Sequence, residues 1–300
     1  MRFHSLGEFI EAADAINEVK VVHGAKLEDE VGCLTELAAE MDGPMLLFDQ
    51  FEGFPRDFRL ASNVYRNSLR RYALALGLPV DAHPMDTVRQ LRERKRQQQP
   101  MPPTVVSDGP VLAHQLTGPD VDVGLFPAPR WHSADGGNYL GTGDLLIMRD
   151  PETGWINFGT YRACVQSRDK VSLWIIKYKR GRIITEKYWA RNQACPAALV
   201  LGCDPLTFMA GTSQQKYEHV GALHGSPVEV LEAPLTGLPI PAGAEIVFEG
   251  EIPPLEEESA PEGPFGEWPG YYSHSGQEAV LRVQRIAHRD APAGTGSRTA

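Results

Sequence analysis

The chain has 300 residues, of which 42% are hydrophobic and 23% are charged, values that fit a globular protein with one large or two medium domains. Its formal net charge of -10 argues against a nucleic-acid surface as the main partner, because neutralising phosphates requires a basic face. No apolar run approaches the roughly 18 residues of a membrane helix and the first residues lack a signal-peptide core, so we expect a cytoplasmic protein without a membrane span.

Helical and strand patterns alternate along the first fifty residues. A capping-box pattern, with Ser5 three residues before Glu8, begins a helix over 6–17, and a strand follows over 19–22. A second amphipathic helix comes next, and the short apolar run at 45–48 predicts a buried strand. The predicted core face of the second helix consists of Val31, Leu34, Leu37, Ala38 and Met41.

Two further helices are predicted before the composition changes. One begins at Asn63 and ends at Gly77, because glycine commonly follows the last turn of a helix. The other covers 85–99 and carries so much charge that we expect it on the surface. Its basic run at 92–96 is interpreted as a solvated helix face, in preference to a nucleic-acid contact. The polar, proline-rich segment 98–103 is the predicted domain boundary.

Strands and tight turns dominate from residue 104 onward. Turn residues at 150–154 predict a hairpin between the strands at 145–148 and 155–158. Many strands with few helices predict an antiparallel barrel or sandwich. Further strands are predicted at 171–176, 197–202 and 245–252. The residues 290–300, rich in Gly, Ala, Ser and Thr, are predicted to form a flexible tail.

Several kinds of site lose support because their sequence signatures are missing. The cysteines form no C-x-x-C pair, so we expect reduced structural thiols rather than a zinc site or a disulfide framework. No G-x-G-x-x-G fingerprint, Walker loop or G-x-S-x-G elbow is present, which disfavours the common nucleotide-binding and hydrolase sites.

The segment 260–272 is the strongest candidate for chemistry. It combines two carboxylates, Glu262 and Glu267, with glycines and prolines that suit neither a helix interior nor a central strand, so we expect a shaped loop. Its aromatic residues can exclude water and separate the pKa values of the two carboxyl groups, as acid-base chemistry requires. They are Phe265, Trp268, Tyr271 and Tyr272. The alternative is an acidic surface turn.

Polar groups also gather where the strand at 155–158 ends. The set fits an anion or the edge of a flavin, and its guanidinium can bind a carboxylate through two parallel hydrogen bonds. These residues are Asn157, Thr160, Tyr161 and Arg162. The alternative is a structural exit from a strand. A basic cluster of Lys177, Lys179 and Arg180 fits either a phosphate site or a polar hairpin tip.

Together these segments resemble the UbiD-like decarboxylases, a family that uses prenylated FMN, over about 6–289. The resemblance implies an α+β protein with an N-terminal α/β domain over 1–103 and a split β-barrel flavin-binding domain over 104–289. It also implies a homo-oligomer and a flavin prenyltransferase that supplies the cofactor. The segments that carry the resemblance are 136–139, 149–151, 157–162, 201–205, 241–247 and 262–267.

The resemblance further implies a reversible, non-oxidative decarboxylase with a catalytic trio of Arg162, Glu262 and Glu267. In that arrangement Arg162 keeps Glu262 ionised and helps to place the flavin and the substrate carboxylate. Glu267, apart from that cation and beside aromatic residues, returns a proton to the carbon that loses CO2. The substrate is then an aromatic or α,β-unsaturated carboxylic acid. The implied cofactor-binding residues are Asn157, Thr160, Tyr161, Arg162, Trp174, Lys177, Lys179 and Lys216.

One departure from the family concerns a divalent metal at the flavin phosphate, which relatives bind through an Asn, a His and a Glu. Asn157 matches the first ligand, but Lys177 and Lys179 lie near the His position and Lys216 lies near the Glu position. A lysine ammonium group can neutralise a phosphate but cannot ligate a metal, so we expect a phosphate held by lysine charge. Manganese and potassium are therefore in doubt.

Other interpretations stay open. A shift of one or two residues in the alignment lets Glu218 and His219 join Asn157 as metal ligands. The family usually continues past this point into a C-terminal domain, so the second functional interpretation is a catalytically weak flavin-binding or scaffolding subunit that needs a partner chain. A plain FMN oxidoreductase is disfavoured, because redox flavin chemistry has no need of the paired-acid loop.

Overall fold

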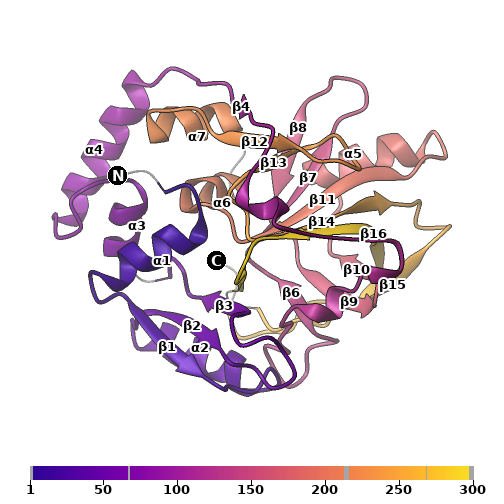
Figure 1. The fold of residues 1–300 in the computed structure, drawn as a ribbon, viewed down its shortest axis with the longest axis horizontal. Helices are drawn as coiled ribbons and strands as arrows, with labels where there is room; N and C mark the ends of the chain where they lie inside the picture. Colours follow the sequence, from indigo (N-terminus) through magenta and orange to yellow (C-terminus); the bar gives the residue numbers. More distant parts are fainter. Residues whose placement is uncertain (1–2, 67, 213–215, 268, 297–300) are drawn as a thin grey trace.

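The computed structural model describes residues 3–66, 68–212, 216–267 and 269–296. Within these ranges the protein is a mixed α+β structure with three sheets. Figure 1 shows the helix-rich N-terminal part on one side of the molecule and most of the large sheet on the other. In the same ranges, no helix combines the length and the apolar composition that a membrane crossing requires.

The N-terminal sheet has the strand order β1-β2-β3-β17. Its strands are β1 (Val19–His23), β2 (Met45–Asp49), β3 (Arg59–Ser62) and β17 (Ala293–Thr295). β1 and β2 confirm the strands predicted at 19–22 and 45–48. The first four residues of β2 are buried, as an apolar strand that is covered on both faces requires.

The first helix, α1 (Leu6–Asp14), begins where the capping box predicts. The Ser5 hydroxyl accepts a hydrogen bond from the Glu8 amide at 3.2 Å and so satisfies one of the free donors at the helix start. The helix ends before the predicted residue 17, because Asn17 adopts a φ of 60° and leaves the right-handed helical region.

The predicted core face of α2 (Glu30–Glu40) is correct only in part, because Val31 is buried and Leu34 and Ala38 pack against the core, but the other two residues do not. Leu37 and Met41 were expected inside but are 53% and 71% exposed. The helix approaches the Trp131 backbone so closely that a Cβ on Gly32 would stand 1.7 Å from the Trp131 carbonyl oxygen. Gly32, Thr35 and Ala39 therefore face the core beside Val31, whereas Leu37 points outward. The buried residues of α2 are Val31, Gly32, Thr35 and Ala39.

The third helix, α3 (Leu69–Ala75), begins at Ser68 and not at Asn63 as predicted. Asn63 instead follows β3, which the sequence analysis missed, and its side-chain amide donates to the Thr35 carbonyl at 2.7 Å. Gly77 follows the helix with a φ of 63°, which confirms the predicted termination.

The helix α4 (Pro84–Gln97) confirms the predicted charged surface helix. Only Thr87 of its 14 residues is buried. The other described helices are α5 (Arg180–Trp189), α6 (Pro205–Gly211) and α7 (Tyr217–His224), with short 3-10 turns η1 (Pro110–Leu112), η2 (Gly118–Asp120) and η3 (Val123–Leu125).

Ten of the described strands form one antiparallel sheet in the order β6-β9-β10-β16-β14-β11-β7-β8, with β15 and β5 also paired to β16. The pairing of β7 with β8 confirms the predicted hairpin. The strands are β5 (His114–Thr117), β6 (Tyr139–Gly141), β7 (Asp144–Arg149), β8 (Ile156–Gly159), β9 (Ala163–Ser167), β10 (Lys170–Leu173), β11 (Cys195–Leu201), β14 (Ile246–Ile252), β15 (Ser259–Glu262) and β16 (Gly276–His288). A small third sheet joins β13 (Pro239–Pro241), β12 (Glu229–Glu232) and β4 (Thr104–Val105).

The last strand corrects the predicted flexible tail. β17 pairs in parallel with β3, so the end of the described chain returns to the N-terminal sheet (Figure 1). Ala293 is fully buried, and its amide donates to the Glu245 carboxylate at 3.0 Å. Its small residues gave no apolar run that sequence reasoning could recognise. The final residues 297–300, like Trp268 of the acidic loop, lie outside the described residues.

Candidate active site

Neighbouring strands of the large sheet bring the predicted trio together. Arg162 lies directly before β9, Glu262 is the last residue of β15, and Glu267 lies in the loop that follows. β10 pairs with both β9 and β16, and β15 pairs with β16. Arg162 therefore meets Glu262, which lies 100 positions later in the sequence, and Glu267, which lies 105 positions later.

The Arg162 guanidinium forks between the two acids. Its Nη2 lies 2.9 Å from Glu262 Oε2, and its Nη1 lies 2.7 Å from Glu267 Oε1. The guanidinium carbon stands 3.5 Å from the centre of the Trp174 ring, a stacking contact that fixes the plane of the fork. The Arg162 and Glu262 side chains are 5% and 1% exposed, whereas Glu267 is 28% exposed. The acid predicted to donate the proton is thus the one that solvent can reach.

The geometry contradicts the expectation that Glu267 lies apart from the cation, and burial adds an effect on Glu262 that opposes that of Arg162. Burial raises the pKa of Glu262, and this effect outweighs the lowering by Arg162 and by the Tyr139 hydroxyl, which donates to Glu262 Oε1 at 3.1 Å. Glu262 is therefore a carboxyl group that holds its proton more readily than an exposed glutamate. Glu267 lies beside the cation, since Arg162 Nη1 donates to Glu267 Oε1 at 2.7 Å. One guanidinium has enough donors to bind two carboxylates.

Two predicted cofactor-binding residues carry buried donors that the described residues leave unpaired. Asn157, on β8, is 5% exposed, and its Nδ2 has no hydrogen-bond partner within the described ranges. Arg162 Nε is likewise buried without a partner there. Burial raises the pKa of Tyr161, against the lowering effect of a hydrogen bond from the Gly181 amide. Buried donors without partners normally mark a place where a further group binds, so the surroundings of Asn157 and of Arg162 are each suited to a polar ligand.

The structure separates the predicted lysines. Lys216, the residue before α7, places its Nζ 5.2 Å from the centre of the Trp155 ring, and Arg180 approaches the same ring at 4.9 Å. Two cations from different helix N-termini therefore meet beside β8. Lys177 and Lys179 are exposed, and Lys177 lies over the Tyr178 ring instead. Of the three lysines, Lys216 contacts Trp155, the residue directly before β8, the strand of Asn157.

No metal centre is evident in the described part of the chain, where no three His, Cys, Asp or Glu side chains are grouped to hold an ion. Glu218 and His219, the alternative ligands, lie on the first turn of α7. Glu218 is half-buried and His219 is exposed.

Sequence reasoning missed two residues that contact the trio. Tyr139 donates to Glu262, and it belongs to the motif 136–139 that had no assigned role. Ser273 Oγ lies 3.0 Å from Arg162 Nη1 and also accepts a hydrogen bond from the Phe265 amide. A lone serine after an aromatic pair carries no signal in the sequence, so only the folded loop could reveal it.

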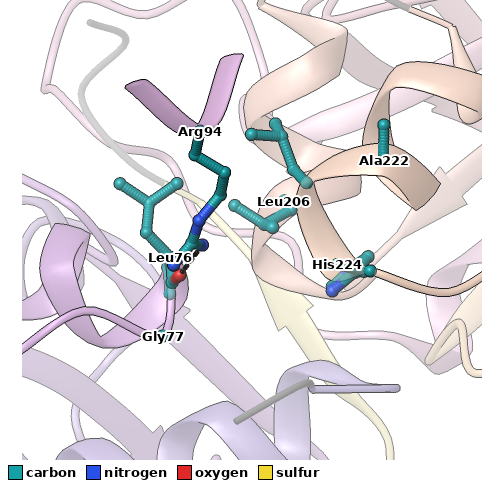
Figure 2. Close-up of a pocket in the computed structure, with 9 residues that line it drawn as sticks. Leu76, Gly77, Arg94, Leu206, Ala222 and His224 are labelled. Atoms are coloured by element: carbon teal, nitrogen blue, oxygen red, sulfur yellow. Dashed lines mark hydrogen bonds between the residues drawn. The ribbon is translucent and has the colours of Figure 1, made fainter. Parts of the chain in front are cut away.

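A separate pocket of about 380 Å³ lies away from the trio. Figure 2 shows Leu76, Gly77 and Arg94 on one side of it and Leu206, Ala222 and His224 on the other. Arg94 donates to the Leu76 carbonyl, and His224 is paired with Asp204 at 3.1 Å. None of the predicted site residues lines this pocket. The lining residues are Ala75, Leu76, Gly77, Arg94, Leu206, Ala222, Leu223, His224 and Gly225.

Comparison with known proteins matches most of the chain to two family models. Residues 10–95 match the 3-octaprenyl-4-hydroxybenzoate carboxy-lyase N-terminal domain, and residues 103–297 match the 3-octaprenyl-4-hydroxybenzoate carboxy-lyase Rift-related domain. A phenolic acid decarboxylase of Sedimentibacter hydroxybenzoicus is 32% identical over 97% of this chain and 62% of its own length. A pyrrole-2-carboxylic acid decarboxylase of Pseudomonas aeruginosa is 33% identical over 88% of this chain and 55% of its own length.

Solved structures show the same likeness. The closed form of the vanillic acid decarboxylase of Sedimentibacter hydroxybenzoicus superposes with a TM-score of 0.92 at 28% identity, covering 100% of this chain and 65% of that one. An evolved dimeric form of the UbiD-class enzyme HmfF from Pelotomaculum thermopropionicum, in complex with prFMN, gives 0.87 at 27% identity, covering 99% and 68%. The chain thus spans about 55 to 62% of the length of the two relatives above. Both family models and these relatives show that the chain belongs to the UbiD carboxy-lyase family.

Proposed function

We propose that this chain carries the active centre of a decarboxylase that acts on an aromatic or α,β-unsaturated carboxylic acid with prenylated FMN. The observation that carries the proposal is the Arg162 fork, which holds Glu262 and Glu267 at 2.9 and 2.7 Å. The decarboxylase names of the relatives support the reaction class. The complex of HmfF with prFMN supports the cofactor.

The large sheet is the proposed cofactor-binding domain, a split β-barrel over 104–289 that follows an N-terminal domain over 1–103. The unpartnered donors of Asn157 and Arg162 fit the polar edge of a flavin, as do the nearby Thr160 and Tyr161. Trp174, half-buried and stacked on Arg162, fits a flat ring system. When bound, the modified flavin supplies an electron sink for the pair released when CO2 leaves.

The chain's own residues then orient the substrate and move one proton. Arg162 fixes the positions of both acids and, through its unpartnered Nε, offers a donor to the cofactor or the substrate carboxylate. Glu267 gives a proton to the carbon that has lost CO2, and regains one from solvent, to which it is 28% exposed. Glu262, whose pKa is raised by burial against the lowering effect of Arg162, holds the guanidinium in place through a contact of 2.9 Å.

Co-expression with a flavin prenyltransferase, followed by mass spectrometry of the bound cofactor and CO2 release from a panel of aromatic and acrylic acids, tests this function. We expect Glu267→Gln to abolish turnover and to leave cofactor binding nearly intact, because the variant loses only the transferable proton. Glu229→Gln, at an exposed position on β12, is the matched control and should keep the parental rate. Equal rates for Glu267→Gln and the parent would remove Glu267 from the mechanism.

We also propose that Lys216 and Arg180 neutralise the cofactor phosphate, which leaves no requirement for manganese or potassium. Both cations lie at helix N-termini beside Trp155, where an anion is favoured. Lys216→Gln should weaken FMN binding about tenfold at low salt and less at high salt, as measured by fluorescence titration. Lys95→Gln, on the exposed face of α4, is the control. Stoichiometric manganese in the purified holoprotein would refute this site and favour Asn157 with Glu218.

The second candidate function is a flavin-binding subunit that turns over only with a partner chain. This chain spans 62% of the length of the Sedimentibacter relative, and a solved structure of the vanillic acid decarboxylase from that organism contains a second polypeptide, a truncated ShVdcD. A chain that binds prenylated FMN with parental affinity but releases CO2 only after a partner polypeptide is added would support this alternative.

A further inference from the structure

A turn at residues 132–136 docks against the acidic loop through three hydrogen bonds. The Gly136 amide donates to the Pro264 carbonyl at 2.8 Å, and the Ala134 amide donates to the Tyr272 hydroxyl at 3.3 Å. The third bond runs the other way, from the Gly266 amide to Asp135 Oδ1 at 2.8 Å. The turn therefore holds the loop on both sides of Glu267.

Asp135 is the centre of this contact. Its side chain is fully buried, and its other oxygen, Oδ2, accepts a hydrogen bond from the His132 amide at 2.9 Å. Arg130 fixes the same residue through its main chain, because Nε and Nη2 donate to the Asp135 carbonyl at 3.1 and 2.8 Å. A buried carboxylate is costly unless backbone donors or charges satisfy it, so this geometry resists displacement.

The anchored residue is the direct neighbour of the acid. Gly266 is held between Asp135 and the His132 ring, and a Cβ at this position would stand 2.4 Å from His132 Nδ1. From there the chain turns in a short hairpin, in which the Glu267 amide donates to the Tyr271 carbonyl at 2.8 Å. The Glu267 side chain pairs with Arg162 and is 28% exposed. Asp135 thus holds the backbone from which this side chain extends.

We propose that Asp135 is a positioning residue that places the Glu267 carboxylate for proton transfer. The inference rests on the proposed role of Glu267 and assigns no contact between Asp135 and the substrate. A proton donor works only within hydrogen-bond reach, and a displacement of about 1 Å costs on the order of a hundredfold in rate. Loss of the Gly266 anchor should therefore lower kcat while substrate binding, made by other residues, is retained.

The anchor is tested without any activity measurement. Hydrogen exchange followed by mass spectrometry, on the FMN-loaded protein, should show faster exchange of the Gly266 amide in Asp135→Asn, because the variant cannot accept from both backbone amides. Tyr272→Phe, at a 46% exposed position, removes only the outer hydrogen bond and is the milder second variant. Unchanged exchange at Gly266 in Asp135→Asn would overturn the proposal.

Kinetics of the prenylated-FMN enzyme test the consequence. Asp135→Asn should lower kcat about 10- to 100-fold with KM nearly constant, and Tyr272→Phe should lower it less. The matched control is Glu249→Gln, because Glu249 is also fully buried and accepts from two backbone amides, those of Leu235 and Thr236, in a different loop. It should lower the Tm and leave kcat unchanged.

The outcomes separate this inference from the proposed function. An inactive Glu267→Gln together with a fully active Asp135→Asn would reduce Asp135 to a structural residue. Equal kcat losses in Asp135→Asn and Glu249→Gln would do the same, because the effect would then follow stability alone. An active Glu267→Gln would instead overturn the proposed function.

Discussion

One guanidinium serves two carboxylates of unequal exposure in this protein. Arg162 pairs with Glu262, which is 1% exposed, and with Glu267, which is 28% exposed. Burial penalises an anion and raises the pKa of Glu262, although both acids share one cation. The fork therefore joins a buried carboxyl group to one that solvent can reach.

Asp144, the first residue of β7, makes the stability of the protein depend on pH. It is fully buried, its Oδ1 accepts from the Tyr161 amide at 3.0 Å, and its Oδ2 has no partner in the described part of the chain. Burial raises its pKa from 3.8 to about 7. The folded protein thus binds this proton more tightly than the unfolded chain does, so the free energy of unfolding falls as the pH rises from about 4 to about 7.

Asp144→Asn should remove this dependence. Between pH 4 and pH 8, urea denaturation should show a decline in unfolding free energy that is smaller than the parent's by on the order of 4 kcal/mol. Asp120→Asn, at an exposed position in η2, is the control and should keep the parental slope. Parallel pH profiles for Asp144→Asn and the parent would contradict the argument.

The residues of the trio were predictable because each belongs to a local motif with unusual composition. Their partners were not predictable, since Tyr139 reaches Glu262 and Ser273 reaches Arg162 only after distant strands pair. The charge states were also beyond the sequence. Arg162 beside Glu262 suggests an ionised acid, but the opposing effect of burial is visible only in the folded sheet.

At the scale of elements, close packing decides where α2 lies. Gly32 allows the helix to touch the Trp131 backbone, and the same contact turns Leu37 outward, against the amphipathic pattern of the sequence. Periodicity predicts that a helix forms and roughly where it ends. It does not predict which face is buried when a glycine permits an approach closer than large side chains would allow.

Gly32→Ala tests this packing. The new Cβ would stand 1.7 Å from the Trp131 carbonyl oxygen, so backbone must move, and we expect the free energy of unfolding to fall by about 1–3 kcal/mol in urea denaturation. Gly7→Ala, inside α1, meets nothing nearer than 3.8 Å and should be neutral or stabilising. Equal stability of Gly32→Ala and Gly7→Ala would show that α2 has room to shift.

At the scale of the whole molecule, β17 connects the N-terminal sheet to the large sheet. It pairs with β3 of the N-terminal sheet, while Ala293 also donates to Glu245, the residue directly before β14 of the large sheet. Glu245 is 1% exposed, and burial raises its pKa against the lowering effects of Arg289 and the Ala293 amide. The strand thus donates a hydrogen bond to the buried Glu245 carboxyl group and also extends the N-terminal sheet.

A chain that stops after Asp290 should therefore lose stability in both parts. Without β17, β3 becomes an edge strand and Glu245 loses a backbone donor, which costs about 1–3 kcal/mol for the unsatisfied acid alone. We expect a lower Tm and faster proteolysis within the N-terminal sheet, measured by calorimetry and limited digestion. A chain that stops after Gly296 keeps β17 and is the control. If both truncated chains melt at the same temperature, β17 does not contribute to the stability of the N-terminal sheet. The two parts of the protein must then be joined by their other contacts.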